Sequence, residues 1–145
     1  KFLRIIKPSA CLFGLKDYQQ QLIIKEFVKR KKIKTDIVSL PIVREKSGLA
    51  MSSRNNYLSD EDKKFCGKIY SCIKNLAASL KISSLEVLKT EAIDFLRNSG
   101  FEIDYLEIVD ANNLSSVTEN TDKILIAVAV IYKKVRLIDN LVVSL

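Results

Sequence analysis

The sequence contains no histidine and no tryptophan, and its 145 residues include only four glycines, two prolines and one methionine. Without histidine, the chain lacks the side chain that most often binds metals and transfers protons near neutral pH. The three cysteines, Cys11, Cys66 and Cys72, form no C-x-x-C pair. This spacing, with no histidine to complete a ligand set, argues against a zinc site. We therefore predict no metal-binding residue and three reduced, buried thiols, as in a cytoplasmic protein.

The sequence also lacks a long hydrophobic segment. Its longest apolar run, ILIAVAVIY at residues 124–132, is far shorter than the ~20 residues that cross a bilayer. No signal-peptide pattern is visible. The hydrophobic content of 48% is typical of a folded chain. We expect one ordinary domain or two small ones, with a buried core.

Positive charge is in excess, with 24 lysines and arginines against 17 acidic residues and a net charge of +7. Such a balance is found in proteins that bind nucleic acid, anionic membranes or phosphorylated ligands, and a role in solubility alone is the alternative. The run KRKKIK at residues 29–34 leaves open a basic α+β nucleic-acid-binding module. A purely structural module is a further alternative, because residues 59–145 are expected to have a core of their own. However, no aromatic residues interleave with this run and no RNA-binding signature is present. Cations at the end of a helix also have a structural role, because they complement the helix dipole.

The first part of the chain is predicted to form a βαβ unit that follows the end of a helix at Pro8. The apolar residues 9–13, closed by Gly14, predict a buried strand. Asp17 is placed to cap a helix whose apolar residues recur at helical spacing. Residues 35–40 predict a second strand. This order implies an α/β class with a parallel sheet.

The second part is predicted to be a small α+β domain with helices and an antiparallel sheet. A helix is expected from Ser59 to Leu80, because three acidic residues occupy its first turn and its apolar residues line one face. A second helix begins near Ser84 and ends at Gly100, the C′ position of a Schellman stop. Three strands are expected at residues 101–109, with a bulge at Leu106, at residues 123–131 and at residues 135–139.

A segment without periodicity, residues 44–58, separates the two parts, and we predict domains at residues 1–50 and 51–145. This segment contains SGLAMSSRNNYLS, in which Ser52, Ser53 and Arg54 are adjacent. Serine hydroxyls and a guanidinium can both bind phosphate oxygens, and a loop between domains can close over a ligand. A polar interdomain loop that merely caps a helix is the alternative.

A second candidate site lies at the turn between the first strand and its helix. Ligands of open α/β sheets bind at the carboxyl ends of the strands. Gly14 would allow close approach to the backbone, and Lys16 would supply a cation beside the helix N–H groups. A plain strand-to-helix turn with an exposed lysine is the alternative. Together, the two loops indicate a nucleotide held between them.

Three motifs resemble one known family. FGLKDYQQQL at residues 13–22, VREKSGLAMSSRNNYLS at residues 43–59 and RLIDN at residues 136–140 are similar to segments of the pantoate–β-alanine ligases, the pantothenate synthetase family. The resemblance covers essentially the whole chain. It implies the C-terminal part of a Rossmann-like nucleotidyltransferase domain followed by the small α+β domain.

The resemblance also implies an activity and a set of site residues. The family uses ATP and Mg²⁺ to adenylate pantoate, and β-alanine then displaces AMP. By this resemblance, a buried Gln20 would bind pantoate, and a second group of residues would bind ATP: Gly14, Leu15, Lys16, Asp17, Val43, Met51, Ser52, Ser53 and Arg54. Lys16, Ser52, Ser53 and Arg54 would be catalytic, because they would stabilise charge on the departing pyrophosphate.

Two departures from the family qualify this assignment. The family's His-x-Gly-His motif has no counterpart here, so the resemblance implies a C-terminal half that does not make pantothenate by itself. Ser47 stands where the family usually has Asp. The resemblance also implies that the parent protein is a cytoplasmic homodimer that acts on small molecules, without nucleic acid or membrane partners.

Overall fold

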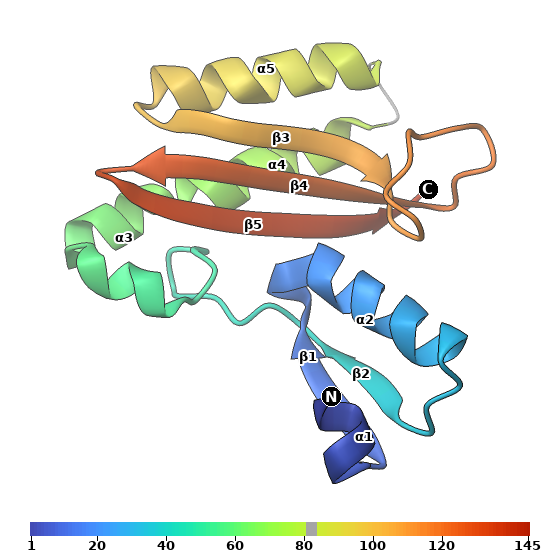
Figure 1. Ribbon diagram of the computed structural model, residues 1–145. Coiled ribbons are helices and arrows are strands. Elements are labelled where there is room, and N and C mark those ends of the chain that lie inside the picture. Colours follow the sequence, from blue (N-terminus) through green and yellow to red (C-terminus); the bar gives the residue numbers. More distant parts are fainter. Residues whose placement is uncertain (81–83) are drawn as a thin grey trace. The chain divides into compact units, whose positions relative to one another are not determined.

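A computed structural model describes residues 1–80 and 84–145 (Figure 1). The chain forms two compact units, Lys1–Ile42 and Val43–Leu145. The division lies before the boundary expected at residues 50 and 51. Residues 43–50 pack with the second unit, where Leu49 and Ala50 are only 3% and 2% exposed.

The first unit is a βαβ unit, as predicted. Its elements are α1 (Phe2–Ile6), β1 (Ala10–Gly14), the 3₁₀ helix η1 (Leu15–Asp17), α2 (Tyr18–Arg30) and β2 (Asp36–Leu40). The two strands are parallel, and their register pairs Ala10 with Asp36 and Gly14 with Leu40. The carboxyl ends of both strands therefore lie at the same edge of the sheet.

The prediction that the first strand is buried is wrong. Residues of β1 alternate between exposed and half-buried, and Leu12 is 64% exposed. The same alternation holds for β2. The cause is the size of this sheet, because two strands beside one helix cannot be covered on both faces.

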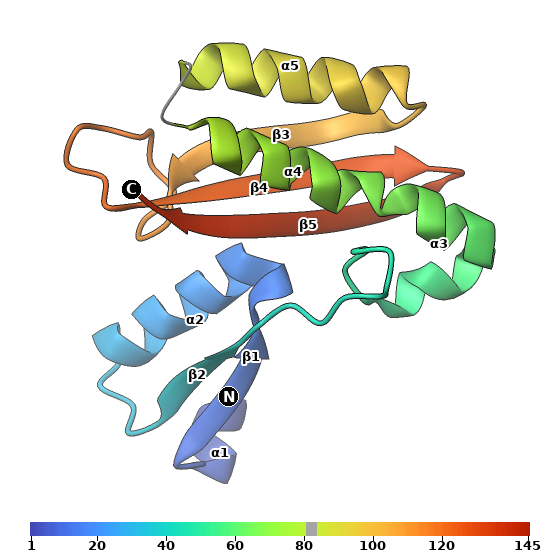
Figure 2. The ribbon, with the colours of Figure 1, turned by 180° about the vertical axis from the view of Figure 1, so that it is seen from behind.

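Among its described residues, the second unit contains the 3₁₀ helix η2, three α-helices and a three-stranded antiparallel sheet in the order β3-β4-β5. The helix α5 packs along β3, and α4 packs against α5, β4 and β5 (Figure 2). The prediction of an α+β unit is therefore confirmed. Its elements are η2 (Ser53–Tyr57), α3 (Asp60–Cys66), α4 (Lys68–Ser79), α5 (Leu85–Asn98), β3 (Glu102–Asp110), β4 (Lys123–Tyr132) and β5 (Val135–Ser144).

The core of this unit lies between the helices and the sheet. Ile73 of α4, Leu96 of α5 and Val128 of β4 are fully buried. The apolar faces read from the sequence thus form the core, although Phe95 remains 45% exposed. Burying a side chain such as that of Ile73 or Leu96 stabilises the fold by about 1.5–3 kcal/mol relative to leaving it exposed.

The local helix signals are confirmed by hydrogen bonds. The Ser59 hydroxyl accepts a bond from the Asp62 N–H over 3.2 Å, and the Ser84 hydroxyl caps α5 in the same way. Gly100 has φ 88°, and Phe101 N–H donates to the Leu96 carbonyl over 3.1 Å. This is the Schellman stop expected at the end of α5.

Three details of the second unit differ from the prediction. The helix expected from Ser59 to Leu80 is divided at Gly67 into α3 and α4. The bulge in β3 lies between Ile103 and Tyr105 rather than at Leu106. The last strand is longer than expected and continues to Ser144, because it pairs with β4 along its whole length. None of the helices in the described residues is long and apolar enough to span a membrane.

Candidate functional site

The first candidate segment is the turn that follows β1. Gly14 is the last residue of the strand and has an extended conformation, with φ −70° and ψ 137°. A Cβ atom added at Gly14 would meet nothing within 4 Å. Glycine is therefore not required by the backbone here, and the space beside it is open. Leu15, Lys16 and Asp17 follow at once in the 3₁₀ helix η1.

The start of α2 holds the other predicted residues of this turn. Asp17 occupies the N-cap position, as predicted, but its side chain makes no capping hydrogen bond. Gln20 is exposed, so the expectation of a buried Gln20 is wrong. The buried amide belongs to Gln21, which is 3% exposed and donates from Nε2 to the Ser39 hydroxyl on β2. The helix turns Gln21 rather than Gln20 toward the sheet.

The second candidate segment is more ordered than its lack of periodicity suggested. Residues 43–51 form a small hairpin in which Arg44 and Ala50 are bridge partners. The Met51 N–H donates to the Val43 carbonyl over 2.9 Å, and the Glu45 N–H donates to the Leu49 carbonyl over 2.9 Å. This pairing fixes the backbone position from which residues 52–54 continue.

The Ser-Ser-Arg sequence then enters the 3₁₀ helix η2. The Ser52 hydroxyl accepts a bond from the Arg54 N–H over 3.3 Å, so this serine caps η2. Ser53 and Arg54 are exposed, as is Met51 at 53%. Asn55, in contrast, is 3% exposed and donates from Nδ2 to the Ala50 carbonyl over 3.2 Å.

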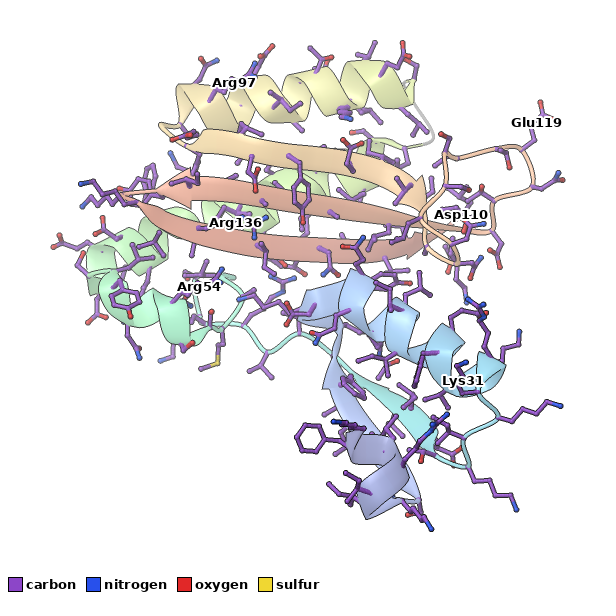
Figure 3. The ribbon with its side chains drawn as sticks, viewed as in Figure 1. Lys31, Arg54, Arg97, Asp110, Glu119 and Arg136 are labelled. Carbon is purple, nitrogen blue, oxygen red and sulfur yellow. The ribbon has the colours of Figure 1, made fainter. Side chains whose placement is uncertain are left out.

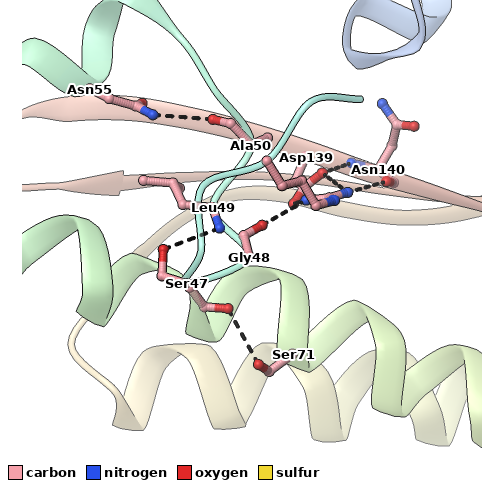
Figure 4. A network of polar contacts seen from close by, with 10 residues as sticks. Ser47, Gly48, Leu49, Ala50, Asn55, Ser71, Asp139 and Asn140 are labelled. Atoms are coloured by element: carbon pink, nitrogen blue, oxygen red, sulfur yellow. Dashed lines mark hydrogen bonds and ion pairs between the residues drawn. The ribbon is translucent and has the colours of Figure 1, made fainter. Parts of the chain in front are cut away.

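A buried ion pair anchors the hairpin to β5 (Figure 4). The Arg44 guanidinium donates to both carboxylate oxygens of Asp139, over 2.6 and 2.8 Å, and to the Gly48 carbonyl over 3.0 Å. Its Cζ atom lies 3.6 Å from the centre of the Tyr70 ring. Asp139 is 4% exposed and also accepts the N–H of Asn140 over 2.7 Å. The planar guanidinium fits this arrangement of a bidentate carboxylate and a stacked ring.

Two glycines allow the hairpin to pack closely. Gly48 has φ 92°, and a Cβ atom there would lie 3.0 Å from the Tyr70 ring. A Cβ atom on Gly67 would lie 2.2 Å from the Ser47 carbonyl oxygen. The Ser47 hydroxyl donates to the Lys63 carbonyl over 3.1 Å. An ionised Asp at this position could not donate that bond.

The predicted site residues thus fall into two groups. The first unit contains Gly14, Leu15, Lys16, Asp17 and Gln20 around one turn, and the second contains Val43, Met51, Ser52, Ser53 and Arg54. The supporting residues Arg44, Asn55 and Asp139 were missed. Their signal was present, because Arg44 and Asp139 lie within two of the family-like motifs, but only the fold brings them together.

The cysteines offer no nucleophile in the second unit. Burial raises the pKa of the Cys66 and Cys72 thiols to about 11. Both thiols are therefore protonated near neutral pH. The prediction of free thiols is confirmed for all three cysteines, although Cys11 is half-buried rather than buried.

The fold and these segments define a class of protein. A parallel βαβ unit with an open glycine turn at the carboxyl edge of its strands is typical of α/β proteins that bind ligands at that edge. The sequence profile of the family described as Pantoate-beta-alanine ligase matches residues 1–142. The chain belongs to the pantoate–beta-alanine ligase family.

Relatives agree with this assignment. The pantothenate synthetase of Vesicomyosocius okutanii is 45% identical over 139 residues, which are 95% of this chain and 49% of that protein. The pantothenate synthetase of Thermosipho africanus is 39% identical over 147 residues, which are 99% of this chain and 52% of that protein. The chain spans about half the length of the curated relatives it matches.

Solved structures show the same fold. Pantothenate synthetase from Thermus thermophilus superimposes with a TM-score of 0.87 at 32% identity, over 97% of this chain and 51% of that one. Pantoate-beta-alanine ligase from Francisella tularensis, complexed with beta-gamma ATP and beta-alanine, has a TM-score of 0.66 at 33% identity, over 97% of this chain and 46% of that one.

Proposed function

We propose that this chain is part of a pantoate–β-alanine ligase, which condenses pantoate with β-alanine at the expense of ATP. The observation that carries the proposal is the Met51–Arg54 segment, in which Met51, Ser53 and Arg54 are exposed, and which follows a hairpin anchored by the ion pair between Arg44 and the buried Asp139. A segment held in this way can present hydroxyl, N–H and guanidinium donors in a fixed arrangement. Membership in the family supports ATP and β-alanine as ligands, because the Francisella tularensis relative was solved with beta-gamma ATP and beta-alanine.

The proposed reaction has two steps. A pantoate carboxylate oxygen attacks the α-phosphorus of ATP. The bond between the α-phosphorus and the oxygen that bridges to the β-phosphorus breaks, and pyrophosphate leaves. The β-alanine amine then attacks the acyl carbon of the pantoyl adenylate, loses a proton and displaces AMP. Negative charge develops on the leaving oxygens in both steps, so cationic and N–H donors aimed at them would lower the barrier.

Each predicted residue has a role in this proposal. Lys16 and Arg54 supply positive charge to the phosphates, and the donors of Ser52 and Ser53 bind phosphate oxygens. The open space at Gly14 leaves room for the nucleotide near the backbone of Leu15 and Asp17. Val43 and Met51 contribute main-chain contacts at the start of the anchored segment. Gln20, exposed beside the turn, is the proposed pantoate ligand.

Mg²⁺ is proposed to accompany ATP. Within residues 1–80 and 84–145, no three His, Cys, Asp or Glu side chains gather into a cluster that could hold a metal ion, so we assign no residue of the chain to it. Phosphate oxygens and water commonly provide most ligands of Mg²⁺ in such sites. The parent protein is further proposed to be a cytoplasmic homodimer.

Pantoate-dependent release of pyrophosphate from ATP tests the function. The full-length protein that contains this chain should release pyrophosphate, whereas the 145-residue chain by itself should not. Arg54→Ala and Lys16→Ala should each lower the rate by about 10²–10³-fold, the usual cost of removing a donor to a developing charge. Arg97→Ala is the matched control, because Arg97 is an exposed cation in the last turn of α5 and belongs to neither group of predicted site residues.

Two results would oppose the proposal. Wild-type rates in both variants would remove Lys16 and Arg54 from the reaction. Tight and steeply salt-dependent binding of RNA or DNA, without pyrophosphate release by the full-length protein, would instead favour the nucleic-acid-binding alternative.

A further inference from the structure

A pocket rich in positive charge lies beside Arg54 in the second unit. It has a volume of about 490 Å³ and is lined by Arg54, Tyr57, Lys133, Lys134, Val135 and Arg136. Arg54 comes from η2, and the last four residues come from the turn between β4 and β5 and from the start of β5. Four of these six side chains are cationic, and none of the described residues that line the pocket is a carboxylate.

The β4–β5 turn presents its lysines in an unusual backbone conformation. Tyr132 pairs with Val135, so Lys133 and Lys134 form a two-residue turn, with φ values of 47° and 66°. Turns with positive φ at both central residues favour Asn and Gly. Two lysines are therefore not the choice that backbone geometry predicts.

Neighbouring carboxylates hold two of the four cations. Lys133 donates to both oxygens of Asp62 over 2.8 and 2.9 Å, and Asp62 also accepts the Tyr132 hydroxyl over 3.2 Å. The Lys133 hydrogen bond accordingly lowers the pKa of Asp62. Arg136 donates to Asp104 from Nε over 2.8 Å, in an exposed ion pair. These pairs fix the shape of the pocket wall and offset the charge of two of its cations.

The other two cations, Lys134 and Arg54, have uncompensated charge. In the part of the chain that the structure describes, neither side chain forms an ion pair with a carboxylate. Both are exposed. The pocket therefore combines a guanidinium, which suits bidentate phosphate contacts, with an ammonium point charge.

We propose that this pocket binds two or more linked phosphoryl groups, as in pyrophosphate or the triphosphate of a nucleotide, and that Lys134 is a ligand of these groups. The placement of Arg54 rests on the proposed function, because Arg54 is assigned there to the phosphates of ATP. Lys134 extends that assignment to the β4–β5 turn. A polyphosphate would bring several negative charges to the two cations that lack a carboxylate partner.

Titration of the 145-residue chain with inorganic pyrophosphate at low ionic strength, followed by ³¹P NMR, tests the pocket directly. Lys134→Gln should weaken pyrophosphate binding by about three- to fivefold, as expected for loss of one exposed charge pair. Lys134→Gly should weaken it equally while leaving the chain at least as thermally stable, because Gly suits a positive φ. Arg97→Gln, which removes a charge from α5 at the other edge of the sheet (Figure 3), should change binding less than twofold.

A gain of affinity provides an independent test. Asp104→Asn releases Arg136 from its ion pair and adds an uncompensated cation to the pocket. Pyrophosphate binding should tighten by about three- to fivefold. Titrations with ATP and AMP separate the possible ligands, since ATP should compete with pyrophosphate and AMP, with one phosphoryl group, should bind more weakly.

Equal weakening in Arg97→Gln and Lys134→Gln would reduce the effect to net charge and overturn the proposal. Absence of pyrophosphate binding to the wild-type chain, or unchanged affinity in both Lys134 variants, would overturn it as well. These results are separable from failure of the proposed function. If the full-length protein released pyrophosphate from ATP but Lys134 proved irrelevant to binding, the proposed ligase function would be supported and the proposed role of Lys134 in the pocket would be refuted.

Discussion

The ion pair between Arg44 and Asp139 leads to the most specific stability prediction. Asp139→Asn keeps the size of the side chain but removes its charge, and the Arg44 guanidinium then loses its bidentate partner. The two side chains are 17% and 3% exposed, so solvent compensates little. Removing one member of a buried pair costs about 3–5 kcal/mol, and we expect about 3 kcal/mol because the amide oxygen can still accept one bond. That loss corresponds to a fall of about 14 °C in the unfolding midpoint of a unit the size of Val43–Leu145.

Urea unfolding followed by circular dichroism measures this loss as a lower midpoint at an unchanged slope. Glu107→Gln is the matched control. It also neutralises a carboxylate of an ion pair, but Glu107 and its partner Lys89 are 53% and 36% exposed. Its cost should be below about 1 kcal/mol. Hydrogen exchange adds a local readout, since the Met51 amide in the hairpin should exchange faster in Asp139→Asn. Equal costs in the two variants, or unchanged exchange at Met51, would refute the anchoring argument.

Further predictions concern packing, pH and thiol reactivity. Gly67→Ala should destabilise the chain by about 2–3 kcal/mol in the same unfolding assay, because the new methyl group would overlap the Ser47 carbonyl. The Lys133 hydrogen bond holds the pKa of Asp62 below 3.8. The pair therefore stabilises the fold above that pH, and this contribution is lost as the pH falls through the lowered pKa. Wild type should lose more stability than Lys133→Ala between about pH 5 and pH 2. Cys11 should react first with a thiol reagent at about pH 8, because the other two thiols are buried and have a pKa of about 11. Simultaneous labelling of all three cysteines would contradict the burial.

Features set by neighbouring residues could be read from the sequence. The serine cap before Asp60 and the glycine stop after α5 depend on groups within a few residues, and the structure has both. The alternating burial of β1 could not be read, because the short apolar run at residues 9–13 carries no information on how many strands lie beside it. The burial expected for Gln20 came from the family resemblance, and the structure instead turns its neighbour Gln21 toward β2.

Features set by residues far apart in the chain were missed. Gly67, where α3 and α4 divide, lies against the Ser47 carbonyl, twenty positions earlier in the sequence. Nothing in the apolar period of residues 65–80 reveals that contact. The partner of Arg44 lies 95 residues away, on β5. The RLIDN motif marked the segment as family-like, but the role of Asp139 in it is visible only once the strands are paired.

In residues 44–55, the side chains that anchor the segment are different from the side chains that face solvent. Arg44 and Asn55 point into the second unit and hold the hairpin and η2 in place, whereas Ser53 and Arg54 between them remain exposed. A single segment therefore carries its own support on either side of the residues proposed to bind phosphate. Because Arg44 holds the hairpin through Asp139, 95 residues away on β5, a change in Arg44 should disturb the position of Arg54 without removing any ligand contact. A change in Arg54 should remove a ligand contact and leave stability nearly intact, since its side chain is exposed and unpaired among the described carboxylates.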